Sequence, residues 1–224
     1  VRFAIRMLWR RPALSVFSAA TLALGIGAVT AVSSIVHAVL VQPLPYPQPD
    51  QIVALRGIVK GARSGISYQN ILDIGERART LVTLSPFFAQ SVNLTGVPEP
   101  DRLRGGFVTS EFFDAVGVQP FIGTAFGDAS DVAHGPRLAV LTYNAWRNRF
   151  ALRRDVVGLP LQLNNATFSV AGVMPESFHF PIDDVEVLLP FWTTTAGTDR
   201  DNHNYIAVGR LTPSATPAQA ALEV

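Results

Sequence analysis

The 224-residue sequence contains no cysteine and a single lysine, Lys60. Without cysteine the chain has no disulfide, no thiolate metal site, no iron–sulfur cluster and no thiol nucleophile. The lone lysine does not complete a glycine-rich P-loop, so the chain cannot hydrolyse ATP by that route. Several classes of enzyme are therefore excluded by composition alone.

Charge is also scarce. Only 16% of the residues are charged, against roughly 25% in an average soluble domain, and none lies between Pro12 and Pro49. Residues 1–11 carry four arginines and no acid, a charge of +4, which leaves −3 for the rest of the chain. The basic residues of that remainder are scattered, so the sequence predicts no nucleic-acid partner.

An apolar run of 29 residues, Ala13 to Val41, has His37 as its only ionisable group. About 20 apolar residues suffice to cross a bilayer, so the run predicts a transmembrane helix, and the preceding arginines predict a cytoplasmic N-terminus. The alternative is a signal peptide, whose apolar core is shorter, about 7–15 residues, and is followed by a cleavage site. The expected organisation is a basic lead over 1–12, a transmembrane helix over 13–41, a connector over 42–50 and an extracytoplasmic body over 51–224.

Small residues recur every four positions along the run, a spacing that lets another helix approach closely. The alternative is that alanine and glycine are simply common in membrane helices. This expected helix-packing face consists of Ser15, Ala19, Ala23, Gly27 and Ala31.

The connector that follows is rich in proline, which cannot continue a helix and favours a stiff, extended segment. We expect a short rigid link in which Tyr46 is an aromatic anchor at the membrane interface. Its candidate residues are Pro43, Pro45, Tyr46 and Pro47.

Hydrophobic period and turn residues in the body predict an α+β fold, a mixed α/β domain with many short strands. Strands are expected over 51–59, 87–94, 102–108, 138–141, 159–163, 167–173, 185–189 and 205–211. Helices are expected after the N-caps Ser67, Thr109 or Ser110, Thr142 and Thr216, the last helix continuing to Val224. Asn164 and Asn165 are expected to form a hairpin turn.

No reactive constellation is visible. The four histidines, at 37, 134, 179 and 203, lack metal-ligand spacing, and neither HExxH nor GxSxG occurs. Asp183, Asp184 and Glu186 are interpreted as a solvated turn before a strand, and Trp146 and Trp192 as core. The sequence predicts no catalytic, cofactor or metal site, and hence a protein that is not an enzyme.

Short motifs nevertheless occur in a particular order along most of the chain. They are Arg10-Arg11-Pro12, Leu22 to Ala28, Gln42 to Pro47, Thr109 to Val118, Val140 to Trp146 with Phe150, Asp155 to Gly158, Leu163-Asn164, Val170 to Pro175 with Phe178 and Phe180-Pro181, and Arg210 to Pro213. In this order they resemble the N-terminal part of MacB/FtsX-like ABC transporter permeases, most closely the duplicated orphan permeases described from acidobacteria. Gln42, where an arginine is common, and Asn165, where a glycine is common, depart from that pattern.

The resemblance implies one span, a MacB-like periplasmic core domain in which this chain would stop, and three further spans. It implies a non-catalytic permease of the bacterial inner membrane that couples ATP hydrolysis by a partner ATPase subunit to a periplasmic conformational change, in efflux or in a lipoprotein- or envelope-related function. The implied partners are that ATPase, a second permease copy, membrane lipid and a periplasmic protein. The residues alone leave two alternatives open: a single-span anchored binding or sensor domain, and a secreted hydrolase.

Overall fold

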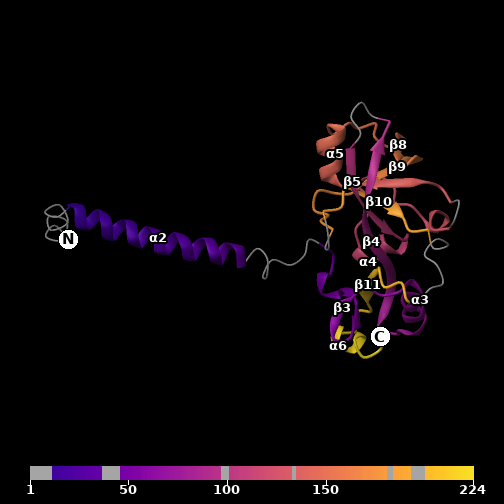
Figure 1. Cartoon of the computed structure of the whole chain (residues 1–224), viewed down its shortest axis with the longest axis horizontal. Coiled ribbons are helices and arrows are strands. Elements are labelled where there is room, and N and C mark those ends of the chain that lie inside the picture. Colours follow the sequence, from indigo (N-terminus) through magenta and orange to yellow (C-terminus); the bar gives the residue numbers. More distant parts are fainter. Residues whose placement is uncertain (1–11, 37–45, 97–100, 133–134, 181–183, 193–199) are drawn as a thin grey trace. The chain divides into compact units, whose positions relative to one another are not determined.

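The structure, a computed structural model, describes residues 12–36, 46–96, 101–132, 135–180, 184–192 and 200–224. The chain divides into two compact units, Val1–Leu44 and Pro45–Val224. The first unit contains the helix α2 (Pro12–Val36) (Figure 1). Within the described residues, no helix meets the combined length and hydropathy expected of a membrane span.

The second unit is built mainly from short strands. They are β1 (Ile52–Leu55), β2 (Gly57–Val59), β3 (Ala62–Ser64), β4 (Leu81–Thr95), β5 (Asp101–Val108), β6 (Ile122–Gly123), β7 (Leu138–Leu141), β8 (Pro160–Leu163), β9 (Ala166–Val173), β10 (Val187–Pro190) and β11 (Ile206–Leu211). The helices and 3-10 turns between them are η2 (Pro49–Gln51), α3 (Tyr68–Arg77), α4 (Glu111–Val116), η3 (Asp128–Ser130), α5 (Tyr143–Phe150) and α6 (Pro217–Ala220). The predicted mixed α/β domain with many short strands is confirmed.

Nine strands form one mixed sheet in the order β1-β11-β4-β5-β10-β7-β9-β6, and β8 pairs with both β4 and β9. Most pairs are antiparallel, but β10 runs parallel to β5 and β7 runs parallel to β9. β2 and β3 form a separate two-stranded sheet. Figure 1 shows α5, β8 and β9 at one end of this unit and β3, α3 and α6 at the other.

Side-chain alternation along the strands sends neighbouring residues to opposite faces of the sheet. In β10, Leu188 joins the apolar cluster that includes α4, whereas Leu189 joins the cluster that includes Trp146 of α5. In β11, Val208 joins the α4 cluster and Ala207 joins a third cluster with α3. The sheet is therefore covered by α4 on one face and, on the other face, by α5 toward one end and α3 toward the other.

Local capping explains three of the helix starts. Ser67 and Thr142 accept hydrogen bonds from the backbone N–H groups of Asn70 and Ala145, which would otherwise lack partners in the first helical turn. Thr216 forms a reciprocal capping box with Gln219. These three predicted caps are confirmed, and so is the turn at Asn164 and Asn165, whose φ angles are 47° and 66°.

Several predicted boundaries are wrong. The strand expected over 51–59 is broken at Arg56, because β1 pairs with β11 whereas β2 turns away to pair with β3. The strand expected from residue 87 begins at Leu81 and contains Pro86. The last helix ends at Ala220 and does not continue to Val224.

Candidate functional site: attachment of the connector to the domain

The predicted helix-packing face lies on α2. Ala19, Ala23, Gly27 and Ala31 are exposed there, and apart from the neighbouring backbone of α2 no described atom lies within 4 Å of where a Cβ of Gly27 would be. Each four-residue step advances about 400° around a helix with 3.6 residues per turn, so the row drifts slowly around α2. The backbone of Ser15 belongs to the same helix, and its side chain lies outside the described residues.

Pro43 and Pro45 of the connector lie outside the described residues, but Tyr46 is the first described residue of the second unit. Its side chain is only 6% exposed, so the predicted role of Tyr46 as an anchor at the membrane interface is wrong. The hydroxyl donates a hydrogen bond to the backbone carbonyl of His179. Burial raises the pKa of Tyr46 to about 12, which keeps the phenol neutral and able to donate.

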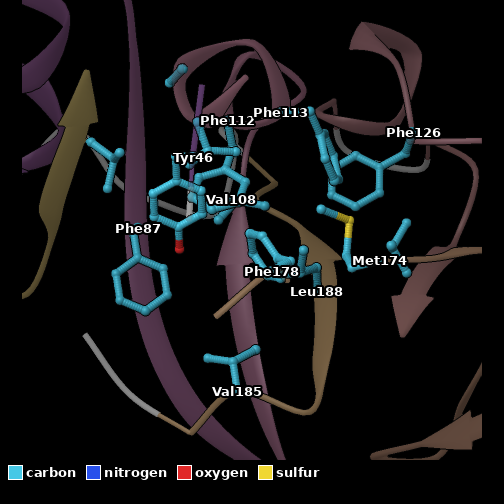
Figure 2. Packing of buried hydrophobic residues seen from close by; sticks show 14 residues of the cluster. Tyr46, Phe87, Val108, Phe112, Phe113, Phe126, Met174, Phe178, Val185 and Leu188 are labelled. Atoms are coloured by element: carbon cyan, nitrogen blue, oxygen red, sulfur yellow. The ribbon is translucent and has the colours of Figure 1, made fainter. Parts of the chain in front are cut away.

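Tyr46 is buried in a wall of aromatic side chains (Figure 2). Its ring centroid lies 6.2 Å from that of Phe178 at an interplanar angle of 60°. Phe112 of α4 stacks on Phe180 at 5.3 Å, and Phe180 contacts Phe87 of β4 at 4.3 Å. The wall is therefore assembled from α4, β4 and the segment after β9, and the connector contributes Tyr46 to it.

Arg210 of β11 makes a second attachment. Its Nε donates to the carbonyl oxygens of Asp114 and Ala115 at 3.2 and 3.0 Å, and Nη1 and Nη2 both lie 3.3 Å from the carbonyl oxygen of Pro47. The carbonyls at the end of α4 have no partner within the helix and carry partial negative charge, so a guanidinium suits them. One side chain thus ties together β11, the end of α4 and the connector.

The glycine that ends α4 fits this arrangement. Gly117 adopts a left-handed conformation, with φ 70°, and a Cβ at this position would lie 2.7 Å from Nη2 of Arg210. A glycine is therefore favoured both by the backbone conformation and by the position of the guanidinium.

The connector also bends where it meets the domain. Gln48 has a left-handed conformation, with φ 51°, and the 3-10 turn η2 follows it. The predicted extended segment is wrong for this described part of the connector. What fixes residues 46–51 is the buried Tyr46 and the Arg210 hydrogen bonds to Pro47.

Of the acidic residues singled out in the sequence, Glu186 has well-defined structural partners. Glu186 accepts from Nε of Arg149 at 2.7 Å and from the backbone N–H of Arg104 at 3.1 Å, and Arg149 also pairs with Asp101. The solvated-turn interpretation of Glu186 is wrong, because this carboxylate joins α5 to the start of β10 and to β5. Asp183 lies outside the described residues.

The N-terminus of α4 differs from the prediction as well. Ser110 is itself in a helical conformation and caps nothing, and Thr109 bonds to Ser85. Instead, Oδ2 of Asp131 accepts from the Ser110 N–H at 2.7 Å, and Oδ1 of Asp128 accepts from the Ser110 hydroxyl at 2.7 Å. Burial raises the pKa of Asp131 to about 6, and the nearby carboxylates of Glu111 and Asp128 add to the shift.

Among the described residues, no group of three His, Cys, Asp or Glu side chains could hold a metal ion. The ring Nδ1 of His179 lies 3.0 Å from the carbonyl oxygen of Ser177, and the backbone N–H of His203 bonds to Asp201. Of the histidines, His37 and His134 lie outside the described residues. The side chains at this site therefore attach the connector to the domain. Arg210 was not predicted as one of them, although a lone cation inside an apolar strand is a recognisable signal.

The sequence and structure comparisons with known proteins point to the same family. The sequence profile of MacB-like periplasmic core domains matches residues 15–224. The structure is similar to the periplasmic region of MacB from Actinobacillus actinomycetemcomitans, with a TM-score of 0.61 and 14% identity over 82% of this chain and 84% of that chain. No curated protein sequence matches the chain significantly.

Two further solved structures have the same fold. A domain from Porphyromonas gingivalis assigned to a permease protein gives a TM-score of 0.60, with 18% identity over 78% of each chain. The extracellular domain of the noncanonic ABC-type transporter YknZ from Gram-positive bacteria gives 0.56, with 12% identity over 75% of this chain and 88% of that chain. At these identities the structures show a shared fold.

Proposed function

Because the chain belongs to the MacB/FtsX-like permease family and carries its MacB-like periplasmic core domain, we propose that it is the non-catalytic membrane part of an ABC transporter. In this proposal a partner ATPase subunit hydrolyses ATP, and the chain converts that cycle into movement of its extracytoplasmic domain. Two permease copies and a periplasmic protein complete the assembly, which serves efflux or an envelope function.

The proposed membrane span is the apolar run Ala13–Val41. It contains no Asp, Glu, Lys or Arg over 29 residues, more than the roughly 20 that a span needs. The arginines at positions 1–11 favour a cytoplasmic N-terminus, which would put residues 51–224 outside the inner membrane. The row from Ser15 to Ala31 is the proposed packing face for other spans.

One observation carries the mechanical part of the proposal: the connector is fastened into the domain at its first described residues. Only residues 42–45 separate Val41 from the buried Tyr46, so at most about 18 Å of extended chain can lie between them. Pro43, Pro45 and Pro47 restrict the backbone of this link. A displacement of the span would therefore be transmitted through Tyr46 and Arg210 to the α4 face of the sheet, because the short link can absorb little of it.

The orientation can be tested with single cysteines, because the sequence has none of its own. Ala4→Cys and Val157→Cys are labelled with a membrane-impermeant maleimide in spheroplasts and again after lysis. We expect Val157→Cys to react in intact spheroplasts and Ala4→Cys to react only after lysis. The reverse pattern would contradict the orientation, and recovery of the chain in the soluble fraction would contradict the span.

A further inference from the structure

The hairpin of β2 and β3 carries the longest run of exposed residues in the described part of the second unit. Residues 58–63 are all exposed, with Ile58 at 77% and Val59 at 43%. The two strands pair with each other and stand apart from the nine-stranded sheet. A two-stranded hairpin is at best marginally stable in water when nothing covers its apolar side chains.

The hairpin and the residues beside it are also one of the cationic stretches of a body that is acidic overall, since residues 12–224 carry a net charge of −3. Residues 51–72 include Arg56, Lys60 and Arg63 and no Asp or Glu, whereas the remainder of residues 12–224 sums to −6. None of these three cations forms an ion pair with any residue that the structure describes. Arg63 is the direct cross-strand partner of Ile58, so the two side chains share one face of the hairpin.

We propose that the β2–β3 hairpin rests on an anionic phospholipid surface, with Ile58 in the headgroup region and Arg56, Lys60 and Arg63 on lipid phosphates. Long cationic side chains next to exposed aliphatic ones are suited to this boundary, because their stems lie in the apolar layer while their charges reach the headgroups. The inference rests on the proposed function, which places the domain beside a bilayer.

The composition of the hairpin favours lipid over a protein partner. A stable protein interface buries roughly 800 Å² on each side and is enriched in aromatic residues. The hairpin, residues 57–64, has no aromatic residue. Its cations extend from a short exposed turn, where Lys60 has φ 50° and Gly61 has φ 81°. Such a surface can contact many equivalent phosphates but offers little shape for a specific protein.

The test uses the full chain reconstituted in vesicles, with one environment-sensitive fluorophore on an introduced cysteine. Ile58→Cys reports on the hairpin and Val29→Cys on α2. Val157→Cys is the control, because it precedes β8 at the opposite end of the domain from β3 (Figure 1). Quenching by nitroxide-labelled headgroups is measured in phosphatidylcholine vesicles and in equimolar phosphatidylcholine and phosphatidylglycerol.

We expect strong quenching at Ile58→Cys in the anionic vesicles, at least fivefold weaker quenching in phosphatidylcholine, and none at Val157→Cys. Lys60→Gln with Arg63→Gln removes two hairpin charges and should lower the Ile58→Cys signal at least fivefold, because each cation near an anionic surface strengthens binding by roughly that factor. Arg137→Gln with Arg154→Gln removes two exposed charges elsewhere and should leave it unchanged. Salt near 1 M, where the Debye length is about 3 Å, should abolish the difference.

Several outcomes would overturn the proposal. One is an unquenched Ile58→Cys in both vesicles while a second probe, a lipid with a nitroxide at the middle of its acyl chain, quenches Val29→Cys. This result rejects the hairpin contact and leaves the span intact. Another is quenching that is equal in both lipids. A third is protection of Ile58→Cys from aqueous iodide without lipid quenching, which would mean that a protein, including a second copy, covers it. If Val29→Cys is not quenched either, the result contradicts both the proposed span and the proposed hairpin contact.

Discussion

Tyr46 is the residue at which the proposed mechanical link can be weakened most selectively. Tyr46→Phe removes only the hydroxyl that donates to the His179 carbonyl. His179 is an exposed residue, so water can replace the lost donor and the free energy of unfolding should fall by about 1 kcal/mol or less. Tyr46→Ala also empties the space of a ring that is 6% exposed, which should cost about 3–4 kcal/mol.

The assay is urea unfolding of the full chain in mild detergent, followed by tryptophan fluorescence. Trp146 and Trp192 report on the domain, and Trp9→Phe removes the third tryptophan. Phe121→Ala is the matched control, since Phe121 is 51% exposed and its loss should cost about 1 kcal/mol at most.

A second readout is local. If Tyr46 fastens the connector, Tyr46→Ala should increase the rate at which a protease cuts residues 42–50 under native conditions, whereas Phe121→Ala should not. A cost below about 1 kcal/mol for Tyr46→Ala, with unchanged cleavage, would refute the attachment.

Three further predictions concern the same face of the domain and the opposite one. The folded pKa of Asp131, about 6, lies above its ordinary value of 3.8, so the contribution of this group to the free energy of unfolding is largest below about pH 4 and is lost as the pH rises through about 6. Asp131→Asn should remove this part of the pH dependence and raise the free energy of unfolding at pH 8 by up to about 3 kcal/mol, measured by urea titration of both proteins at several pH values. Gly117→Ala should destabilise the domain by about 1–2 kcal/mol through its left-handed backbone and the clash with Arg210, and the same substitution in an Arg210→Ala background should cost less in a double-mutant cycle. Glu186→Gln should lower the melting temperature by a few degrees, because Arg149 loses one of its two charged partners in a half-buried site, and that difference should shrink at high salt.

The features that the sequence predicted well are those decided by a few neighbouring residues. The caps Ser67, Thr142 and Thr216 and the Asn164-Asn165 turn depend on side-chain chemistry within one helical or hairpin turn. The strand over 138–141 was predicted with the bounds that β7 has, because a short apolar run between turn residues has few alternatives.

The errors arise where distant residues decide the outcome. The strand predicted to begin at residue 87 begins at Leu81, because its pairing with β11 continues through Pro86 after its pairing with β5 has stopped at Phe87. Pro86 has no N–H, so it suits a position where only one neighbouring strand is paired. Ser110 is a residue type that commonly caps helices, but the acceptor at the start of α4 is Asp131, 21 residues away, which accepts from the Ser110 N–H. Tyr46 follows an apolar run and has the character of an interface anchor, but a cluster of phenylalanines from three other segments buries it.

The candidate site was predictable only in part. Proline spacing located the connector, but the groups that hold it, Arg210 and the His179 carbonyl, lie more than 130 residues further along the chain. Glu186 similarly appeared as part of a turn because its partner Arg149 lies 37 residues away. Such partners become visible only when the sheet order is known.

The most direct test of rigid coupling inserts a flexible Gly-Ser segment between Gln42 and Pro43 of the chain assembled with the proposed partner ATPase. Pulsed electron spin resonance then measures the distance between spin labels on Val157→Cys of two permease copies, with and without ATP. We predict that the insertion leaves ATP hydrolysis intact and abolishes the ATP-driven distance change, while the same insertion between Val97 and Pro98 abolishes neither. An unchanged distance shift after insertion at Pro43 would contradict a mechanism in which the connector transmits the movement of the span.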